Sequence, residues 1–145
     1  MKSRSLLNGL RIAAIVLLFI VSLNALAAGY SFIVEPSGKD VGITTDYLRP
    51  SAPFTNYLFP GMVLFVVIGV MSSLIAVLAI KKTSQYPLLV AMQGCVLAGW
   101  IAIQLLMVKA FHPLHGIIAA AGLLLILIGW ILHINFPVFK KHLEM

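Results

Sequence analysis

The chain has 145 residues, of which 61% are hydrophobic and only 10% are charged. A soluble domain carries about 25% charged residues, and a small one leaves much of its surface in water. This composition excludes a water-soluble globule and predicts one domain whose main partner is the lipid bilayer. The net charge of +6 does not indicate nucleic acid, because the basic residues flank apolar segments and form no single patch.

Four apolar segments have the length that a membrane-spanning helix needs, about 20 residues. They cover residues 12–34, 58–80, 87–108 and 116–134, and none contains Asp, Glu, Lys or Arg. Backbone groups in hydrocarbon must be satisfied within their own segment, so these segments should be helices. The sequence therefore predicts an all-α, four-helix membrane bundle of residues 1–145 with a long outer loop at 35–56. Pro137 is expected to end the fourth helix.

The first apolar segment allows a second interpretation. A basic start that includes Lys2 and Arg4, an apolar middle and the sequence Ala25-Leu26-Ala27 are typical of a cleaved signal peptide. The apolar stretch is longer than the usual core of a signal peptide, so we expect it to be retained as a span.

The distribution of lysine and arginine predicts the orientation. Seven lie in the N-terminus, in the connection between the second and third segments, or in the C-terminal tail: Lys2, Arg4, Arg11, Lys81, Lys82, Lys140 and Lys141. Three lie in the other two connections: Lys39, Arg49 and Lys109. Because basic residues concentrate on the cytoplasmic side, both termini are predicted to be cytoplasmic, in a multi-pass protein of the bacterial plasma (inner) membrane.

The connection over residues 35–56 is the part of the sequence with room for structure outside the membrane. Loops this long in compact proteins are usually functional or ordered against the domain. Polar and aromatic side chains in or beside it are candidates for interactions there: Glu35, Asp46, Arg49 and Tyr57.

Small residues predict where the helices touch, because helices in lipid associate through close packing and interhelical hydrogen bonds. The third segment carries two ridges of small residues four apart, Ala91-Cys95-Gly99 and Gly94-Ala98-Ala102. We therefore expect this helix at the centre of the bundle.

The third segment also carries a polar face. Gln93, Trp100 and Gln104 fall within about 40° of one another on a helix, and the face should point inward because a buried amide needs partners. Depth in the membrane predicts those partners: Gln93 with Ser72 and Ser73, and Gln104 with Asn24. Polar groups in spans more often pair than line a pore, so we interpret this face as interhelical contact. A ligand cavity beside Trp100, Gln104 and Asn24 is the alternative.

Motifs for catalysis, metals or cofactors are absent from the sequence. There is no HExxH, G-x-S-x-G, P-loop or Rossmann glycine pattern, and the single cysteine, Cys95, allows no intrachain disulfide or cysteine zinc site. His112 and His115 could share a metal, but no carboxylate is adjacent, so we interpret them as interfacial histidines beside Pro113. We expect no cofactor and no enzyme.

A pattern of proline, glycine and aromatic residues suggests a relationship. It consists of Pro36-x-Gly38, Gly42-Ile43, Leu48, Pro53-Phe54-x-x-Tyr57-x-x-Pro60-Gly61, Gly94, Trp100 and Gln104. Over residues 35–104 the chain thereby resembles an uncharacterised bacterial family of small four-span membrane proteins. Its architecture is also similar, more weakly, to that of DoxX-type proteins. These resemblances imply the four-helix fold and bring no substrate or catalytic residue with them.

Three functions follow from these features. The first is a non-enzymatic accessory or scaffold subunit that presents the outer loop and associates with other membrane proteins or with itself. The second is a binder of a small molecule, lipid or quinone, or a small transporter component. The third is a membrane enzyme that uses the histidines and carboxylates of the outer surface.

Overall fold

The computed structural model describes residues 2–39, 46, 50, 55–107 and 113–143, and these ranges contain helices and no strand. The helices are α1 (Lys2–Val34), α2 (Leu58–Val63), η3 (Leu64–Val70), α3 (Met71–Ile80), α4 (Tyr86–Met107) and α5 (Pro113–Leu143). Four stretches are long and apolar enough to cross a membrane: Ser5–Val34, Leu58–Ile80, Tyr86–Met107 and His115–Asn135. The predicted all-α class with four spanning helices is confirmed.

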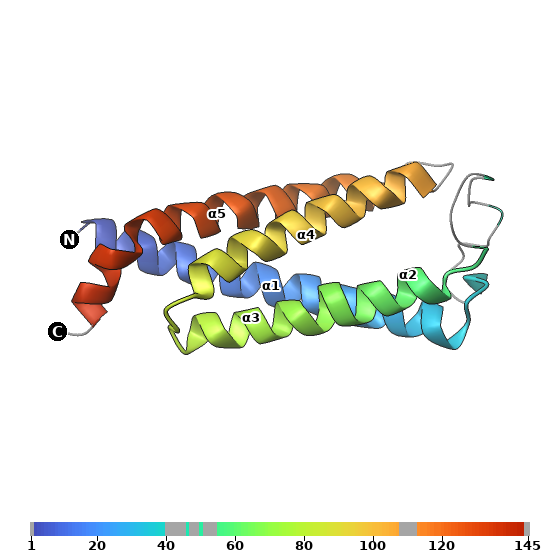
Figure 1. The fold of residues 1–145 in the computed structure, drawn as a ribbon, viewed down its shortest axis with the longest axis horizontal. Helices are drawn as coiled ribbons and strands as arrows, with labels where there is room; N and C mark the ends of the chain where they lie inside the picture. The colour runs from blue at the N-terminus through green and yellow to red at the C-terminus, as the bar shows by residue number, and fades with distance from the viewer. Residues whose placement is uncertain (1, 40–45, 47–49, 51–54, 108–112, 144–145) are drawn as a thin grey trace.

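The helices form two antiparallel hairpins that lie side by side (Figure 1). The first pairs α1 with the continuous helix α2–η3–α3, and the second pairs α4 with α5. Both chain termini and the turn between α3 and α4 lie at one end of the bundle, which we call the terminal end. The last turns of α1 and α4 lie at the opposite end, which we call the loop end.

The central helix is α1. It packs against α2, η3, α3 and α5, whereas α4 packs mainly against α5 and only briefly against α3 and η3. The expectation that the third span lies at the centre is therefore wrong. Small buried residues also occur along α1, at Ala14, Ser22, Ala25 and Gly29, and they let the other helices approach it closely.

The buried side chains form two separate clusters. The larger one runs between the hairpins and reaches Trp100, its member on α4 that lies nearest the loop end. The smaller one lies at the loop end of the first hairpin, where Phe32 and Tyr57 stack with ring centroids 4.9 Å apart. Among the described residues, α2 and α4 share no extensive contact, so the hairpins part at the loop end (Figure 1).

The second span is not α-helical throughout. Over η3 its backbone N–H groups bond five residues back, and the Met71 N–H accordingly donates to the Val66 carbonyl. The ladder then returns in α3 to bonds four residues back, which direct the Ser72 N–H to Ile68. The carbonyl of Val67 is passed over at this change, so one carbonyl near mid-span has no backbone donor.

Glycine residues set the distance between paired helices. A Cβ built on Gly29 of α1 would lie 2.6 Å from the Phe65 nitrogen, and one on Gly94 of α4 would lie 2.6 Å from the Gly122 oxygen. Backbones can approach this closely only where the residue has no side chain. Both hairpins are therefore held by direct contact between backbones.

The fourth span differs from expectation at its end. Helix α5 continues through Pro137 to Leu143, although that proline was expected to stop it. A proline removes one N–H donor and bends a helix without necessarily ending it, and α5 bends near its C-terminal end (Figure 1).

The turn after α3 contains a lysine in the left-handed conformation. Lys82 has φ 57°, and the Thr83 N–H donates back to the Leu78 carbonyl at 3.2 Å, the pattern of a helix C-terminus that usually carries glycine. We expect Lys82→Gly to raise the free energy of unfolding by about 1 kcal/mol, because glycine avoids the strain. Unfolding in mixed detergent–SDS micelles measures this. Lys81→Gly is the control, since it removes the same charge at a residue with φ −74°. An equal increase in the free energy of unfolding for Lys81→Gly would contradict the prediction.

Candidate functional site

A buried polar cluster occupies the middle of the bundle at the end of η3. Gln93 of α4 donates from Nε2 to the Ser72 hydroxyl at 2.9 Å and to the Val67 carbonyl at 3.0 Å. Both side chains are buried. The amide thus supplies the donor that the Val67 carbonyl lacks within its own helix, and the predicted contact between Gln93 and Ser72 is present.

Ser73 takes a different partner from the one expected. Its hydroxyl bonds to the hydroxyl of Ser22 on α1, and Ser22 in turn donates to the Gly69 carbonyl at 2.8 Å. Ser73 therefore joins α1 to the second span, while Ser72 joins the second span to α4. Ser22 was not predicted to take part, although a serine inside the first span at the depth of Ser73 was a usable signal. The Val67 and Gly69 carbonyls had no signal, because nothing in the sequence marked the π-helix.

The helical repeat orients the rest of the polar face of α4. Trp100 and Gln104 follow Gln93 by seven and eleven residues, which places each within about 20° of Gln93 around the helix axis. Gln93 contacts η3, so Trp100 and Gln104 lie on the face that α4 turns toward the first hairpin. Trp100 is 7% exposed, and Gln104 is half-buried.

Trp100 has an unsatisfied donor. Its indole Nε1–H is fully covered and has no hydrogen-bond partner among the described residues. A buried tryptophan N–H usually finds an acceptor, and leaving a polar group unpaired in hydrocarbon is costly. Among the described residues, Trp100 is thus a buried member of the polar face whose donor the surrounding helices do not satisfy.

The predicted contact between Gln104 and Asn24 is not made. Asn24 is exposed, and its Nδ2 donates to the Ile20 carbonyl of its own helix at 2.9 Å. An asparagine side chain can reach the carbonyl four residues back, so it satisfies its donor locally while it faces lipid. Depth alone placed the two amides at one level, but α1 and α4 do not pack extensively against each other.

At the loop end, the chain folds back through a tight turn. The Ser37 hydroxyl donates to the Glu35 carboxylate at 2.7 Å, and the Tyr57 N–H donates to the Pro36 carbonyl at 2.8 Å. The hydroxyl and N–H of Ser37 hold the pKa of the Glu35 carboxyl below its usual value. The ionised carboxylate therefore stabilises the turn at pH values above the ordinary pKa of a glutamate. This contribution is lost as the pH falls through the lowered pKa of Glu35 in the folded protein.

The remaining candidates are only partly described. Asp46 is exposed, and His115 is half-buried, while Arg49 and His112 lie outside the described residues. No group of three or more His, Cys, Asp or Glu side chains that could hold a metal occurs in the described ranges. The two central candidates, Gln93 and Trp100, are neutral, so the chemistry available at mid-span is hydrogen bonding and packing.

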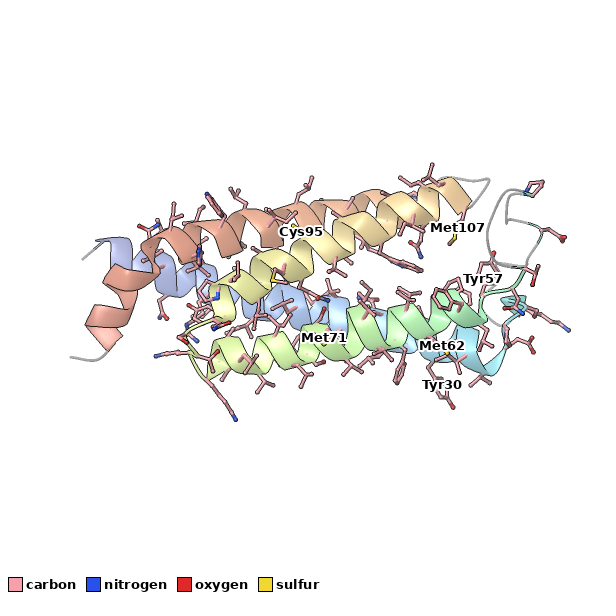
Figure 2. All side chains as sticks on the ribbon, viewed as in Figure 1. Tyr30, Tyr57, Met62, Met71, Cys95 and Met107 are labelled. Carbon is pink, nitrogen blue, oxygen red and sulfur yellow. The ribbon has the colours of Figure 1, made fainter. Side chains whose placement is uncertain are left out.

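The face of α4 away from both neighbours carries small residues. Ala91, Gly94 and Ala98 meet α5, but Cys95 and Ala102 are exposed, and a Cβ on Gly99 would meet nothing within 4 Å. The small residues of the two predicted ridges therefore divide into two groups. One group packs against α5 and builds the hairpin, whereas Cys95, Gly99 and Ala102 have no helix packed on them among the described residues. Figure 2 shows Cys95 on α4.

Fold and polar cluster together define a class: the chain is a multi-pass α-helical membrane protein with an uncharged polar centre. Comparisons with protein-family models, with curated proteins and with solved structures find no match to it. The resemblance of residues 35–104 to a four-span bacterial family, and the weaker likeness to DoxX-type proteins, stay predictions.

Proposed function

We propose that this chain is a non-enzymatic accessory or scaffold subunit of the bacterial inner membrane that packs against another membrane-spanning helix. The contact surface is the exposed face of α4 formed by Cys95, Gly99 and Ala102, which we call the open face. Both termini lie in the cytoplasm, and residues 35–56 are presented on the other side. The basic residues Lys81 and Lys82, which follow α3 at the terminal end, support this orientation.

The open face supports this proposal because its small residues are typical of a contact between helices, yet no described helix of this protein covers them. The same helix uses Gly94 and Ala98 to bring its backbone against α5, which shows how small residues act in this bundle. Large side chains instead cover the lipid-facing surface nearby, among them Leu88, Met92 and Ile103, all of them exposed. A stripe without bulk lets a further helix come close, and close approach is what drives association in lipid.

The native cysteine gives a direct test. We expect oxidation of membranes with a thiol-specific catalyst to cross-link Cys95 to the helix on the open face, in the simplest case that of a second copy. Gly99→Leu should reduce the cross-linked fraction about tenfold, because a leucine would hold the helices apart. Cross-linked mass, read by gel electrophoresis and mass spectrometry, identifies the partner.

Two controls make the result specific. Gly99→Leu should not lower the unfolding midpoint of the isolated protein, since a Cβ there would meet no described atom within 4 Å and leucine favours a helix more than glycine does. A second variant combines Cys95→Ala with Leu124→Cys, which moves the thiol to an exposed position on α5, and it should cross-link only at background level. The proposal is wrong if Cys95 in native membranes cross-links to nothing, or if Gly99→Leu leaves the product intact.

A further inference from the structure

The buried N–H of Trp100 needs an acceptor that the described residues do not supply. Its partner cannot be a neighbouring side chain or carbonyl among the described residues, and water is scarce at this depth in a bilayer. The side chain is part of the main core and lies on the face of α4 toward the first hairpin. An acceptor that reaches this N–H must therefore come between the two hairpins.

The position of Trp100 along α4 restricts what that acceptor can be. It precedes the last residue of α4, Met107, by seven positions, or about 10 Å along the axis. The ester carbonyls of phospholipids lie at the boundary of the hydrocarbon core, near the ends of spanning helices. They are therefore too shallow for Trp100. A carbonyl that penetrates the hydrocarbon belongs to an apolar molecule that dissolves in the membrane interior.

Gln104 adds a second polar group in the right place. It lies one helical turn beyond Trp100 on the same face, and side chains so spaced have Cβ atoms about 6 Å apart. Gln104 is half-buried, and no described hydrogen bond occupies its amide. Two donors that follow each other along one helix face can bond to two carbonyl oxygens of the same ring.

Among the described residues, contact between α4 and the first hairpin decreases from α3 through η3 to α2. Trp100 is the last residue of α4 in the main core, although Ile101 and Met107 beyond it are also buried. Among the described residues, the partly buried Leu64 packs against both this core and the cluster of Phe32 and Tyr57. Figure 2 shows Tyr57 beside the start of α2 and Met107 at the end of α4, and both side chains are buried. A ligand would reach the indole by displacing the side chains that cover it, and little contact between α2 and α4 would have to be broken.

We propose that Trp100 and Gln104 bind a membrane-soluble quinone between the two hairpins, with the indole N–H donating to one ring carbonyl and the Gln104 amide donating to the other. The site binds the quinone and carries out no electron transfer. It does not depend on the open face of α4, which lies on another side of the helix, so the two proposals can fail separately.

Fluorescence quenching measures this binding in the full chain. The protein has two tryptophans, and Trp130 is exposed on α5, so Trp130→Phe leaves Trp100 as the only reporter. In phosphatidylcholine nanodiscs, we expect decylubiquinone to quench Trp100 saturably. In the converse variant, Trp100→Phe, the exposed Trp130 should be quenched only in proportion to the quinone dissolved in the lipid.

Variants of the donors test the hydrogen bonds. Gln104→Leu in the Trp130→Phe background should weaken the saturable binding about tenfold, equivalent to about 1.4 kcal/mol. Asn24→Leu is the matched control, since it removes an exposed amide that bonds within its own helix, and it should change nothing. The quinone that co-purifies with Trp100→Phe, extracted and measured by absorbance, should fall about tenfold relative to Trp130→Phe.

Three results would overturn the proposal. The first is quenching of Trp100 that never saturates. The second is quinone binding that is equally strong in Trp100→Phe and Gln104→Leu as in their controls. The third is a phospholipid that native mass spectrometry finds bound to the protein with Trp100 but not to Trp100→Phe, and that quinone does not displace. This result would assign the site to a lipid. Loss of binding in Gly99→Leu is not expected, and unchanged binding there would separate this site from the open face.

Discussion

Gly94→Ala should destabilise the protein by about 3 kcal/mol. A single added methyl group would lie 2.6 Å from the Gly122 oxygen and 2.7 Å from the Ile126 nitrogen. Both atoms belong to the backbone of α5, which cannot turn away as a side chain can. The second hairpin must then open along the contact, and overpacking of this kind costs about 1–3 kcal/mol or more. Unfolding of the purified protein in SDS-containing micelles, followed by circular dichroism, gives the value.

The same substitution five residues further along α4 is the control. A Cβ on Gly99 would meet nothing within 4 Å, so Gly99→Ala should leave stability unchanged or raise it by up to about 1 kcal/mol through helix propensity. Gly122→Ala should fall between the two, because its Cβ would lie 3.1 Å from the Gly94 oxygen. Equal effects of Gly94→Ala and Gly99→Ala would show that α4 and α5 do not pack as described.

Gln93→Leu should cost about 2 kcal/mol. The leucine has nearly the volume of glutamine, so the loss comes from the two hydrogen bonds to Ser72 and to the Val67 carbonyl. Polar contacts between membrane helices average about 0.6 kcal/mol, but this amide also satisfies a carbonyl that the π-helix leaves without a donor. A buried acceptor left unpaired costs about 1–3 kcal/mol.

Gln104→Leu tests whether the position of the amide matters. It replaces a half-buried glutamine of the same helix that makes no described hydrogen bond, so we expect a change below about 0.5 kcal/mol without added quinone. Amide I spectra with a ¹³C label at Val67 would report the carbonyl directly, with a shift in Gln93→Leu and none in Gln104→Leu. An unshifted band in Gln93→Leu would contradict the assigned hydrogen bond.

The polar candidates show how far depth in the membrane predicts contacts. Gln93 and Ser72 were paired correctly because their helices approach each other at that level. Gln104 and Asn24 do not pair although they lie at the same depth, because α1 and α4 do not pack extensively against each other. Ser22 escaped notice for a related reason: its partners, Ser73 and the Gly69 carbonyl, depend on α1 being the central helix.

The sequence by itself determined that the chain belongs in a membrane, that it is helical, and how many spans it has. These follow from local properties: apolar segments of membrane length without charges must satisfy their own backbones, and only helices do so within one segment. The tertiary structure decided which helix is central, which glycines meet, where the π-helix interrupts the second span, and which polar groups pair. Those features depend on side chains and carbonyls brought together from different helices, and small differences in close packing select among many arrangements of four similar apolar helices.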